Sequence, residues 1–155
     1  MPAVVVAAAD LAAATVFGEA SDLEVRLTPE GDRRVLRLDV RRGDTIALHY
    51  QHSVERTPVV EIFRVEPDGL WFVEMRFASQ GAGLPTEGYV WEGNQFVHRR
   101  PRRIGALPVR VSALAGHRLR VGRREVDLVA EFRDGSAVTI AAAPRPRWLR
   151  LPGAR

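Results

Sequence analysis

Cysteine is absent from the 155-residue sequence, and this absence excludes several kinds of chemistry. A chain without thiolates has no disulfides, no cysteine nucleophile, no iron–sulfur cluster and no cysteine-ligated zinc. No stretch approaches the length of about 18 uncharged apolar residues that a transmembrane helix needs. What remains is 46% hydrophobic and 27% charged, which is the composition of a single globular domain and not of a disordered chain.

Lysine is missing as well, so all 23 basic residues are arginine and the formal net charge is +4. Exclusive use of arginine raises the sequence pI to about 10.8 without implying a strongly positive surface. The arginines gather in Arg99–Arg103 and in the C-terminal tail from Arg145. Such clusters can bind nucleic acid or another anionic partner, or they can be a solvated hairpin rim and a peripheral tail. Because no aromatic side chain lies within Arg99–Arg103 to stack on bases, nucleic acid is the less favoured partner.

Residues 1–21 begin with an alanine- and valine-rich run that has no counterpart later in the chain. They end in Gly18-Glu19-Ala20, a small-x-small pattern typical of a signal-peptidase site, although a basic flank is lacking and Asp10 interrupts the apolar run. Two interpretations stay open. The segment is either a signal or anchor, which would make the protein extracytoplasmic, or an extra N-terminal strand near residues 3–8 of a cytoplasmic protein.

Over residues 22–142 apolar side chains alternate with polar ones, the period-two pattern of half-buried strands. In residues 36–41, for example, leucine or valine occupies every second position and a charged residue the others. Turn sequences such as Pro67-Asp68-Gly69 and Glu92-Gly93-Asn94 separate these segments, and no sustained helical period occurs. The pattern predicts one all-β domain, an antiparallel sandwich or a partly open barrel, followed by a Pro/Arg-rich tail over residues 143–155.

One hairpin has a register that can be predicted. If Pro67-Asp68-Gly69 forms a three-residue loop, Glu66 pairs with Leu70. The further predicted pairs are Val65 with Trp71, Phe63 with Val73, Glu61 with Met75 and Val59 with Phe77. This register gathers the large apolar side chains on one face, whereas a two-residue loop would scatter them. Glu61 then lies on the apolar face, where an unpaired carboxylate is unfavourable.

A candidate site follows from the same alternation. Every second residue from Ile46 leads to His52, and a short polar connection containing Ser53 and Thr57 joins His52 to the strand of Glu61. We expect Glu61 to be ionised and paired with His52. Such a pair can act in acid–base chemistry, orient a ligand or satisfy a structural network. A structural or binding role is favoured, because the sequence provides no nucleophile–base geometry.

The glycine-rich segment Gly81-Ala82-Gly83-Leu84-Pro85 is the second unusual feature. Its backbone N–H groups could cradle an anion, or the segment could be a crossover turn between sheets. It is no P-loop, since lysine is absent and no helix is predicted after it. The four histidines, His49, His52, His98 and His117, show no metal-ligand spacing, and neither a metal nor a cofactor is predicted.

These segments together resemble a known family. The run Tyr50-x-His52-Ser53-Val54-x-x-Thr57-Pro58-Val59-x-Glu61, with Gly43-Asp44 before it and Gly81–Pro85 after it, looks like the bacterial domain-of-unknown-function family numbered 1850. The segment from Gly116 to Leu128 is similar to that family's closing strands. The positions that match the family are His52, Ser53, Thr57, Glu61, Gly81, Gly83 and Pro85.

The resemblance implies a small exported or membrane-tethered protein. Family members are often associated with tripartite TRAP transporters whose solute receptor is of the TRAP-associated extracytoplasmic immunogenic (TAXI) class. The leading hypothesis is therefore a non-enzymatic accessory or ligand-handling protein, with transporter subunits or a small polar solute as partners. The alternatives are a small enzyme that uses His52 as general base oriented by Glu61, and an anion- or nucleic-acid-binding protein that uses Arg99–Arg103. The oligomeric state is not predicted.

Overall fold

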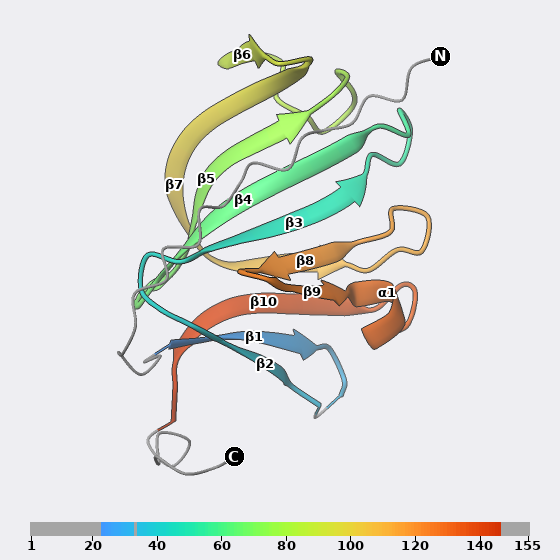
Figure 1. Ribbon diagram of the computed structural model, residues 1–155. Helices are drawn as coiled ribbons and strands as arrows, with labels where there is room; N and C mark the ends of the chain where they lie inside the picture. Colours follow the sequence, from blue (N-terminus) through green and yellow to red (C-terminus); the bar gives the residue numbers. More distant parts are fainter. Residues whose placement is uncertain (1–22, 33, 147–155) are drawn as a thin grey trace.

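The structure, a computed structural model, describes residues 23–32 and 34–146, and antiparallel strands dominate it (Figure 1). The elements are β1 (Leu23–Pro29), β2 (Leu36–Val40), β3 (Thr45–Gln51), β4 (Pro58–Glu66), β5 (Gly69–Phe77), β6 (Tyr89–Glu92), β7 (Gln95–Arg110), β8 (Arg118–Val121), β9 (Arg124–Asp127), α1 (Leu128–Glu131) and β10 (Ala137–Pro144). The strands form one curled sheet, a half-barrel. The predicted all-β class is confirmed.

The sheet has the strand order β2-β1-β10-β7-β5-β4-β3-β8-β9, and β6 pairs with β7 beside this path. The 16-residue strand β7 joins the two halves, because its first part pairs with β5 and β6 and its last part pairs with β10. Register shifts opposite β5 bend it strongly. At one bend Gly69 has a φ of 121°, and a Cβ there would lie 2.7 Å from the carbonyl oxygen of Gly105. Only glycine allows the two backbones to approach so closely.

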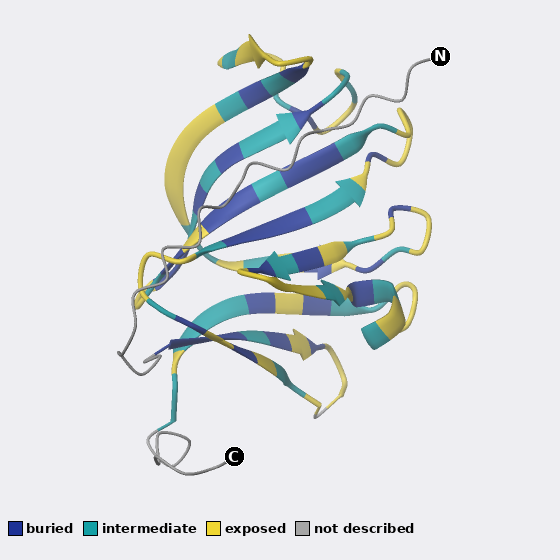
Figure 2. Ribbon diagram, viewed as in Figure 1, coloured by how far each residue is buried: buried dark blue, intermediate teal, exposed yellow. Residues whose placement is uncertain are grey.

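The main apolar core lies inside the curl, on the face that we call concave. Its fully buried side chains come from strands on both sides of the curl and include Leu27, Ile46, Phe63, Leu119 and Ile140. Figure 2 shows the buried positions along β1, β3, β4 and β10. A smaller apolar cluster of Val59, Phe77 and Leu84 lies near the end of β5. Each large side chain buried in this way contributes roughly 1.5–3 kcal/mol to folding.

The β4–β5 hairpin confirms part of the predicted register and corrects the rest. The pairs Glu61–Met75 and Val59–Phe77 form as predicted, whereas the pairs nearer the turn are Phe63–Phe72, Arg64–Trp71, Val65–Leu70 and Glu66–Gly69. The loop therefore contains only Pro67 and Asp68. The prediction was wrong there because a bulge between Ile62 and Phe63 shifts the register by one residue. This bulge, which no local sequence signal announced, returns the apolar residues to one face.

The predicted limits of the domain, residues 22 and 142, lie close to the ends of the described strands. Residues 1–21 lie outside the described residues, so both interpretations of that segment stay predictions. At the other end, β10 continues to Pro144, where it pairs with Leu23, two residues past the predicted limit at 142. The part of the tail after residue 146 is also outside the described residues. In the part of the chain that is described, no helix combines the length and the hydropathy that a membrane span requires.

Candidate functional site

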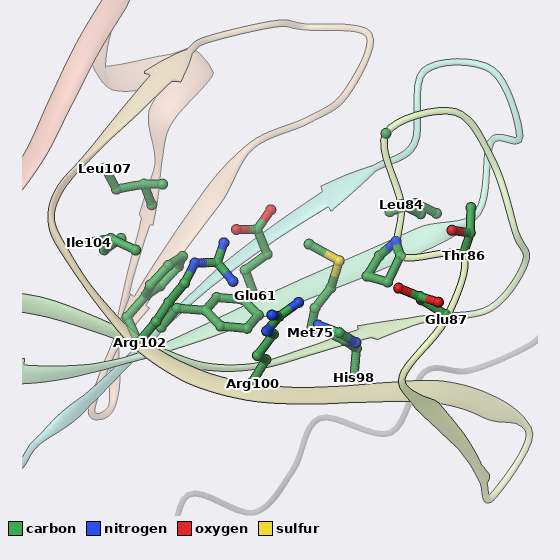
Figure 3. A pocket seen from close by; sticks show the side chains of 14 residues that line it. Glu61, Met75, Leu84, Thr86, Glu87, His98, Arg100, Arg102, Ile104 and Leu107 are labelled. Atoms are coloured by element: carbon green, nitrogen blue, oxygen red, sulfur yellow. The ribbon is translucent and has the colours of Figure 1, made fainter.

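A pocket of about 450 Å³ opens on the concave face of the half-barrel (Figure 3). Side chains of β4, β5 and β7 line it, together with the loop between β5 and β6. Its polar side chains are Glu61, Thr86, Glu87, His98, Arg100 and Arg102. The pocket separates Phe63 and Phe72 of the main core from Leu84 of the smaller cluster. The curl of the sheet thus leaves a space between two apolar clusters, and charged groups enter it.

Glu61 lies on the concave face of β4, paired across the sheet with Leu48 and Met75. The Tyr50 hydroxyl donates a 2.7 Å hydrogen bond to Oε1 of Glu61. Burial raises the pKa of Glu61, and the bond from Tyr50 and the charge of Arg102 offset only part of that effect. Burial and the nearby Glu61 also raise the pKa of Tyr50, so its hydroxyl remains a donor. The pocket therefore contains a carboxylate that takes up a proton more readily than an exposed glutamate.

The expected ion pair between His52 and Glu61 does not form. Nδ1 of His52 accepts the backbone N–H of Glu55 at 3.1 Å, and Nε2 donates to the carbonyl oxygen of Ala82 at 2.8 Å. The prediction was wrong because β3 ends at Gln51 and the alternation ends with it. His52 begins a turn instead, and its side chain, 7% exposed, faces the loop after β5. Both ring nitrogens bond to backbone groups, so this histidine holds two loops together.

The loop from Ser79 to Pro85 packs closely on that turn. The Thr57 and Ser79 hydroxyls lie 2.8 Å apart, within hydrogen-bonding distance. A Cβ on Gly81 would lie 2.9 Å from Cε1 of His52, so a glycine is needed at this contact. The loop therefore owes its position to the turn, and through Gly83 and Pro85 it forms one wall of the concave pocket.

A second pocket of about 360 Å³ lies on the other side of this loop. His52 and Ser53 line it, with Tyr50 and His117, whose ring centroids are 5.5 Å apart. Burial lowers the pKa of His117. The predicted site residues are therefore divided: His52 and Ser53 line the second pocket, Glu61 and Pro85 line the first, and Gly83 lines both.

Arg100 and Arg102 were missed as pocket residues by sequence reasoning, which treated them as part of a basic segment. Successive side chains of β7 point to opposite faces, and these two enter the concave pocket. The guanidinium carbon of Arg102 lies 4.8 Å from the centroid of the Phe72 ring. Within residues 23–32 and 34–146 neither guanidinium forms a hydrogen bond or an ion pair. Alternation through His98, Arg100, Arg102 and Ile104 was the signal that could have found them.

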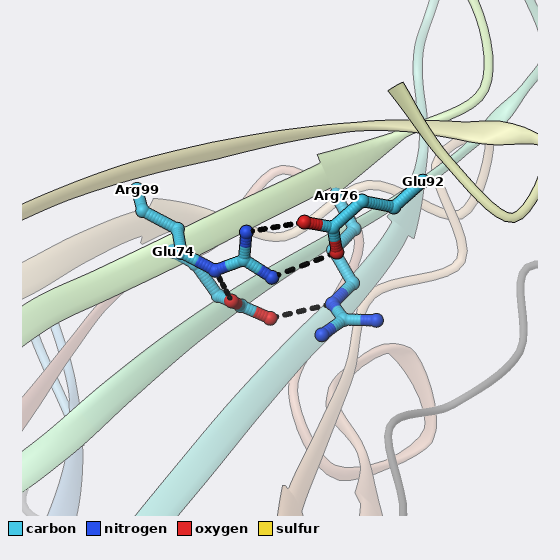
Figure 4. Close-up of polar contacts among 4 residues, drawn as sticks. All are labelled: Glu74, Arg76, Glu92 and Arg99. Atoms are coloured by element: carbon cyan, nitrogen blue, oxygen red, sulfur yellow. Dashed lines mark hydrogen bonds and ion pairs between the residues drawn. The ribbon is translucent and has the colours of Figure 1, made fainter. Parts of the chain in front are cut away.

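Arg99 and Arg103 point to the opposite, convex face, where carboxylates neutralise them. Nε of Arg99 donates to Glu74 at 2.9 Å, and its terminal nitrogens donate to both carboxylate oxygens of Glu92 (Figure 4). Arg76 also donates to Glu74, and Arg103 contacts Asp68 at 2.9 Å. The Arg99–Arg103 segment is therefore not one basic patch, since two of its four arginines lie on each face of β7. Among the described residues, no group of three or more histidines and carboxylates could hold a metal ion.

Residues 46–128, more than half of the chain, match the family described as a domain of unknown function, DUF1850. The chain belongs to this family. The resemblance seen in the sequence is thereby confirmed. The DUF1850 segment spans β3 to β9 and includes the residues of the turn at His52, Glu61 and both pocket arginines. Searches of curated proteins and of solved structures gave no match.

Proposed function

We propose that this DUF1850 protein is a non-enzymatic ligand-handling protein that binds a small polar solute in the concave pocket. The observation that carries the proposal is the pair of arginines, Arg100 and Arg102, which enter a pocket of about 450 Å³ and form no ion pair with any carboxylate among residues 23–32 and 34–146. Pockets for small molecules range from about 300 to 1,000 Å³ and combine apolar walls with a few converging polar groups. This pocket has that size, and its wall combines apolar side chains with a larger share of charged and polar ones.

The geometry gives less support to an enzyme that uses His52 as general base. A general base needs a ring nitrogen within reach of substrate, and both nitrogens of His52 bond to backbone groups. The carboxylate of Glu61 accepts from Tyr50 and does not orient the histidine. Nucleic-acid binding through Arg99–Arg103 also gains little support, because Arg99 and Arg103 are already ion-paired.

The proposal extends to the partner and the compartment. On this account the protein works outside the cytoplasm, exported or membrane-tethered, and passes its solute to or from the subunits of a TRAP-type transporter. This part rests on the family resemblance, while the pocket supports the ligand-handling part. The two parts are therefore tested by separate experiments.

Ligand binding can be followed inside the pocket itself. Met75 lines the pocket, so methyl-labelled methionine places a signal in the site. Titration with a panel of small organic acids, amines, amides and sugars should shift the Met75 signal with at least one class, saturably. A panel in which no class moves Met75 would overturn the ligand-handling proposal.

The partner can be identified by co-purification from gently solubilised membranes of the native host. Wild type and an Arg100→Gln/Arg102→Gln variant should be compared. We expect transporter subunits to copurify with the wild type, in smaller amounts with the variant if occupancy of the pocket governs docking. Recovery of the protein wholly in the cytosol, without transporter subunits, would contradict the transporter and compartment parts.

A further inference from the structure

We propose that the concave pocket binds a small amphipathic monocarboxylate between Arg100 and Arg102, and that binding is coupled to proton uptake by Glu61. The inference rests on the proposed function, since it names the class of ligand that the pocket takes. Four features of the pocket carry it: the charges in its wall, the placement of the arginines, its apolar side chains and the groups around Glu61.

The charges in the wall fit a single negative charge on the ligand. Arg100 and Arg102 contribute two positive charges, and Glu61 and Glu87 contribute two negative charges when both are ionised. The fully ionised wall is therefore neutral. A proton on Glu61 leaves one net positive charge, which one carboxylate balances. A phosphate ester, with a charge near −2, would leave the pocket negatively charged.

The placement of the two arginines suits a carboxylate. They are two residues apart on β7, and both line the pocket from the stretch where the pairing with β5 shifts register between Phe72 and Glu74. Two guanidinium groups at that spacing can donate charge-assisted hydrogen bonds to the two oxygens of one carboxylate. The contact of Arg102 with the Phe72 ring holds one of them in place before the ligand arrives.

The apolar part of the pocket wall favours a ligand with an apolar body. The apolar side chains of the pocket are Phe63, Phe72, Met75, Leu84, Pro85, Ile104 and Leu107. A ligand that is polar throughout would leave these surfaces in contact with polar groups and gain little from them. An acid with a short hydrocarbon chain or ring covers them and removes apolar surface from water. Figure 3 shows Met75 and the two arginines around the same space.

Glu61 makes binding depend on pH. Tyr50 faces its carboxyl group from β3, the uncharged Met75 from β5, and Arg100 and Arg102 from β7, with Glu87 and His98 also in the pocket wall. An ionised Glu61 repels a carboxylate bound beside it, and a protonated Glu61 does not. Affinity should therefore rise as pH falls, for as long as the ligand itself stays ionised.

Two further titratable side chains, Glu87 and His98, line the same pocket. Nδ1 of His98 lies 3.0 Å from the carbonyl oxygen of Gly88 and donates to it. Replacement of Glu61 isolates its own contribution, because the part of the pH dependence that Glu61→Gln removes belongs to Glu61.

The test titrates methyl-labelled full-length protein with octanoate, its neutral analogue octanamide and the cation octylammonium. We expect octanoate to shift the Met75 signal and to bind at least about tenfold more tightly than octanamide, because charge-assisted hydrogen bonds are lost with the charge. Octanoate should bind more tightly at about pH 5.5 than at about pH 7.5, a range in which its own carboxyl group stays ionised. Octylammonium should not bind.

Variants assign the effect to residues. Arg100→Gln and Arg102→Gln should each weaken octanoate binding about tenfold or more. Arg123→Gln, which removes the same charge from the exposed β8–β9 turn, should leave it unchanged. Glu61→Gln should keep tight binding at about pH 7.5 and lose most of the pH dependence. Urea unfolding of every variant distinguishes a loss of ligand binding from a loss of folding.

Each result that would contradict the inference identifies a different part of it as wrong. If octanamide binds as tightly as octanoate, the pocket binds solutes and the proposed function stands, but the monocarboxylate class is wrong. If Arg123→Gln weakens octanoate binding as much as the pocket variants do, the binding is non-specific and the inference fails. If Glu61→Gln retains the full pH dependence, proton uptake by Glu61 is wrong. If neither octanoate nor any class in the wider panel moves Met75, the inference and the proposed function fail together.

Discussion

The Arg99–Arg103 segment of strand β7 carries two arginines on each face, and the two pairs have opposite surroundings. On the convex face Arg99 and Arg103 donate to carboxylates of β5, β6 and the β4–β5 turn. On the concave face Arg100 and Arg102 have no such partner in the part of the chain that the structure describes. Each face of the segment carries two arginine side chains. The difference therefore lies in whether the neighbouring strands place carboxylates beside them.

The comparison separates structural charge from charge that is available to a ligand. The convex network ties β6 to the sheet, because Arg99 bridges Glu74 of β5 and Glu92 of β6 (Figure 4). Removing it should affect folding and leave ligand binding intact. Within the described residues the concave arginines form no ion pair, and Arg102 contacts β5 only through the Phe72 ring, so their removal should affect binding much more than folding.

The largest loss of stability should follow Glu74→Ala, which breaks the convex network at its centre. Glu74 is 7% exposed and pairs with Arg76 and Arg99, so its loss removes the ion pair of Arg76 and leaves Arg99 paired with Glu92 alone. We expect the free energy of unfolding to fall by about 2–3 kcal/mol, less than for a fully buried pair because Arg99 is half exposed. Urea denaturation measures it, with Glu92→Ala, at the exposed end of the network, as a control with a smaller effect. An unchanged midpoint for Glu74→Ala would show that the network is not structural.

A smaller loss should follow Gly81→Ala, which acts on the pocket side. The new Cβ would lie 2.8 Å from Cγ of Glu55 and 2.9 Å from Cε1 of His52, and the turn and loop must separate to admit it. We expect a loss of about 1–2 kcal/mol. In a His52→Ala background the same substitution should be less destabilising, because the contact with the ring is gone and only the one with Glu55 remains. Gly83→Ala, whose Cβ meets nothing within 4 Å but whose φ is 84°, is the control, with a loss that His52→Ala does not change. Equal losses from Gly81→Ala in both backgrounds would mean that His52 does not position the loop.

Tyr50→Phe should lower the stability moderately, and it tests the effect of the Tyr50 hydrogen bond on Glu61. The variant removes the 2.7 Å hydrogen bond to the carboxylate and nothing else from the ring. We expect a loss of about 1 kcal/mol near neutral pH. Because that bond favours the ionised form, the pKa of Glu61 should rise further in the variant. Carbon-detected titration of the carboxyl group measures the pKa, and a lower value in Tyr50→Phe would contradict the assignment.

The pH dependence of stability should show the smallest effect. Folding holds the pKa of Glu61 above its ordinary value of 4.5, so its contribution to stability is fully present below that value and is lost as pH rises through the raised pKa. Glu61→Gln cannot ionise and lacks this loss. Relative to the variant, the wild type should therefore become less stable as pH increases, which urea denaturation from about pH 5 to about pH 8 measures. A wild type that gains stability relative to the variant over that range would reverse the sign and contradict the account.

The sequence was sufficient for the features that depend on local pattern. Period-two alternation predicted the all-β class, and the motif around His52 and Glu61 identified the family. The partner of Glu61 was not predictable, because the alternation that carried His52 onto the inward face ended one residue earlier, at Gln51. Tyr50 takes that place.

The register shifts of β5 against β4 and β7 explain why the hairpin register was predicted only in part. Each depends on contacts with a neighbouring strand, such as the approach of Gly69 to Gly105, and not on the residues of one hairpin. The pocket lies beside the bent part of β7. The division of the Arg99–Arg103 segment between two faces was readable from alternation alone, had the segment been treated as a strand.

The most direct measurement compares two double variants, Arg99→Gln/Arg103→Gln and Arg100→Gln/Arg102→Gln, in urea unfolding and in octanoate titration at about pH 5.5. The account predicts that the first pair lowers the unfolding midpoint and keeps binding, whereas the second keeps the midpoint and loses binding by about a hundredfold. If both variants lose binding equally, or if the concave variant unfolds as early as the convex one, the separation of structural from ligand-binding arginines on β7 is wrong.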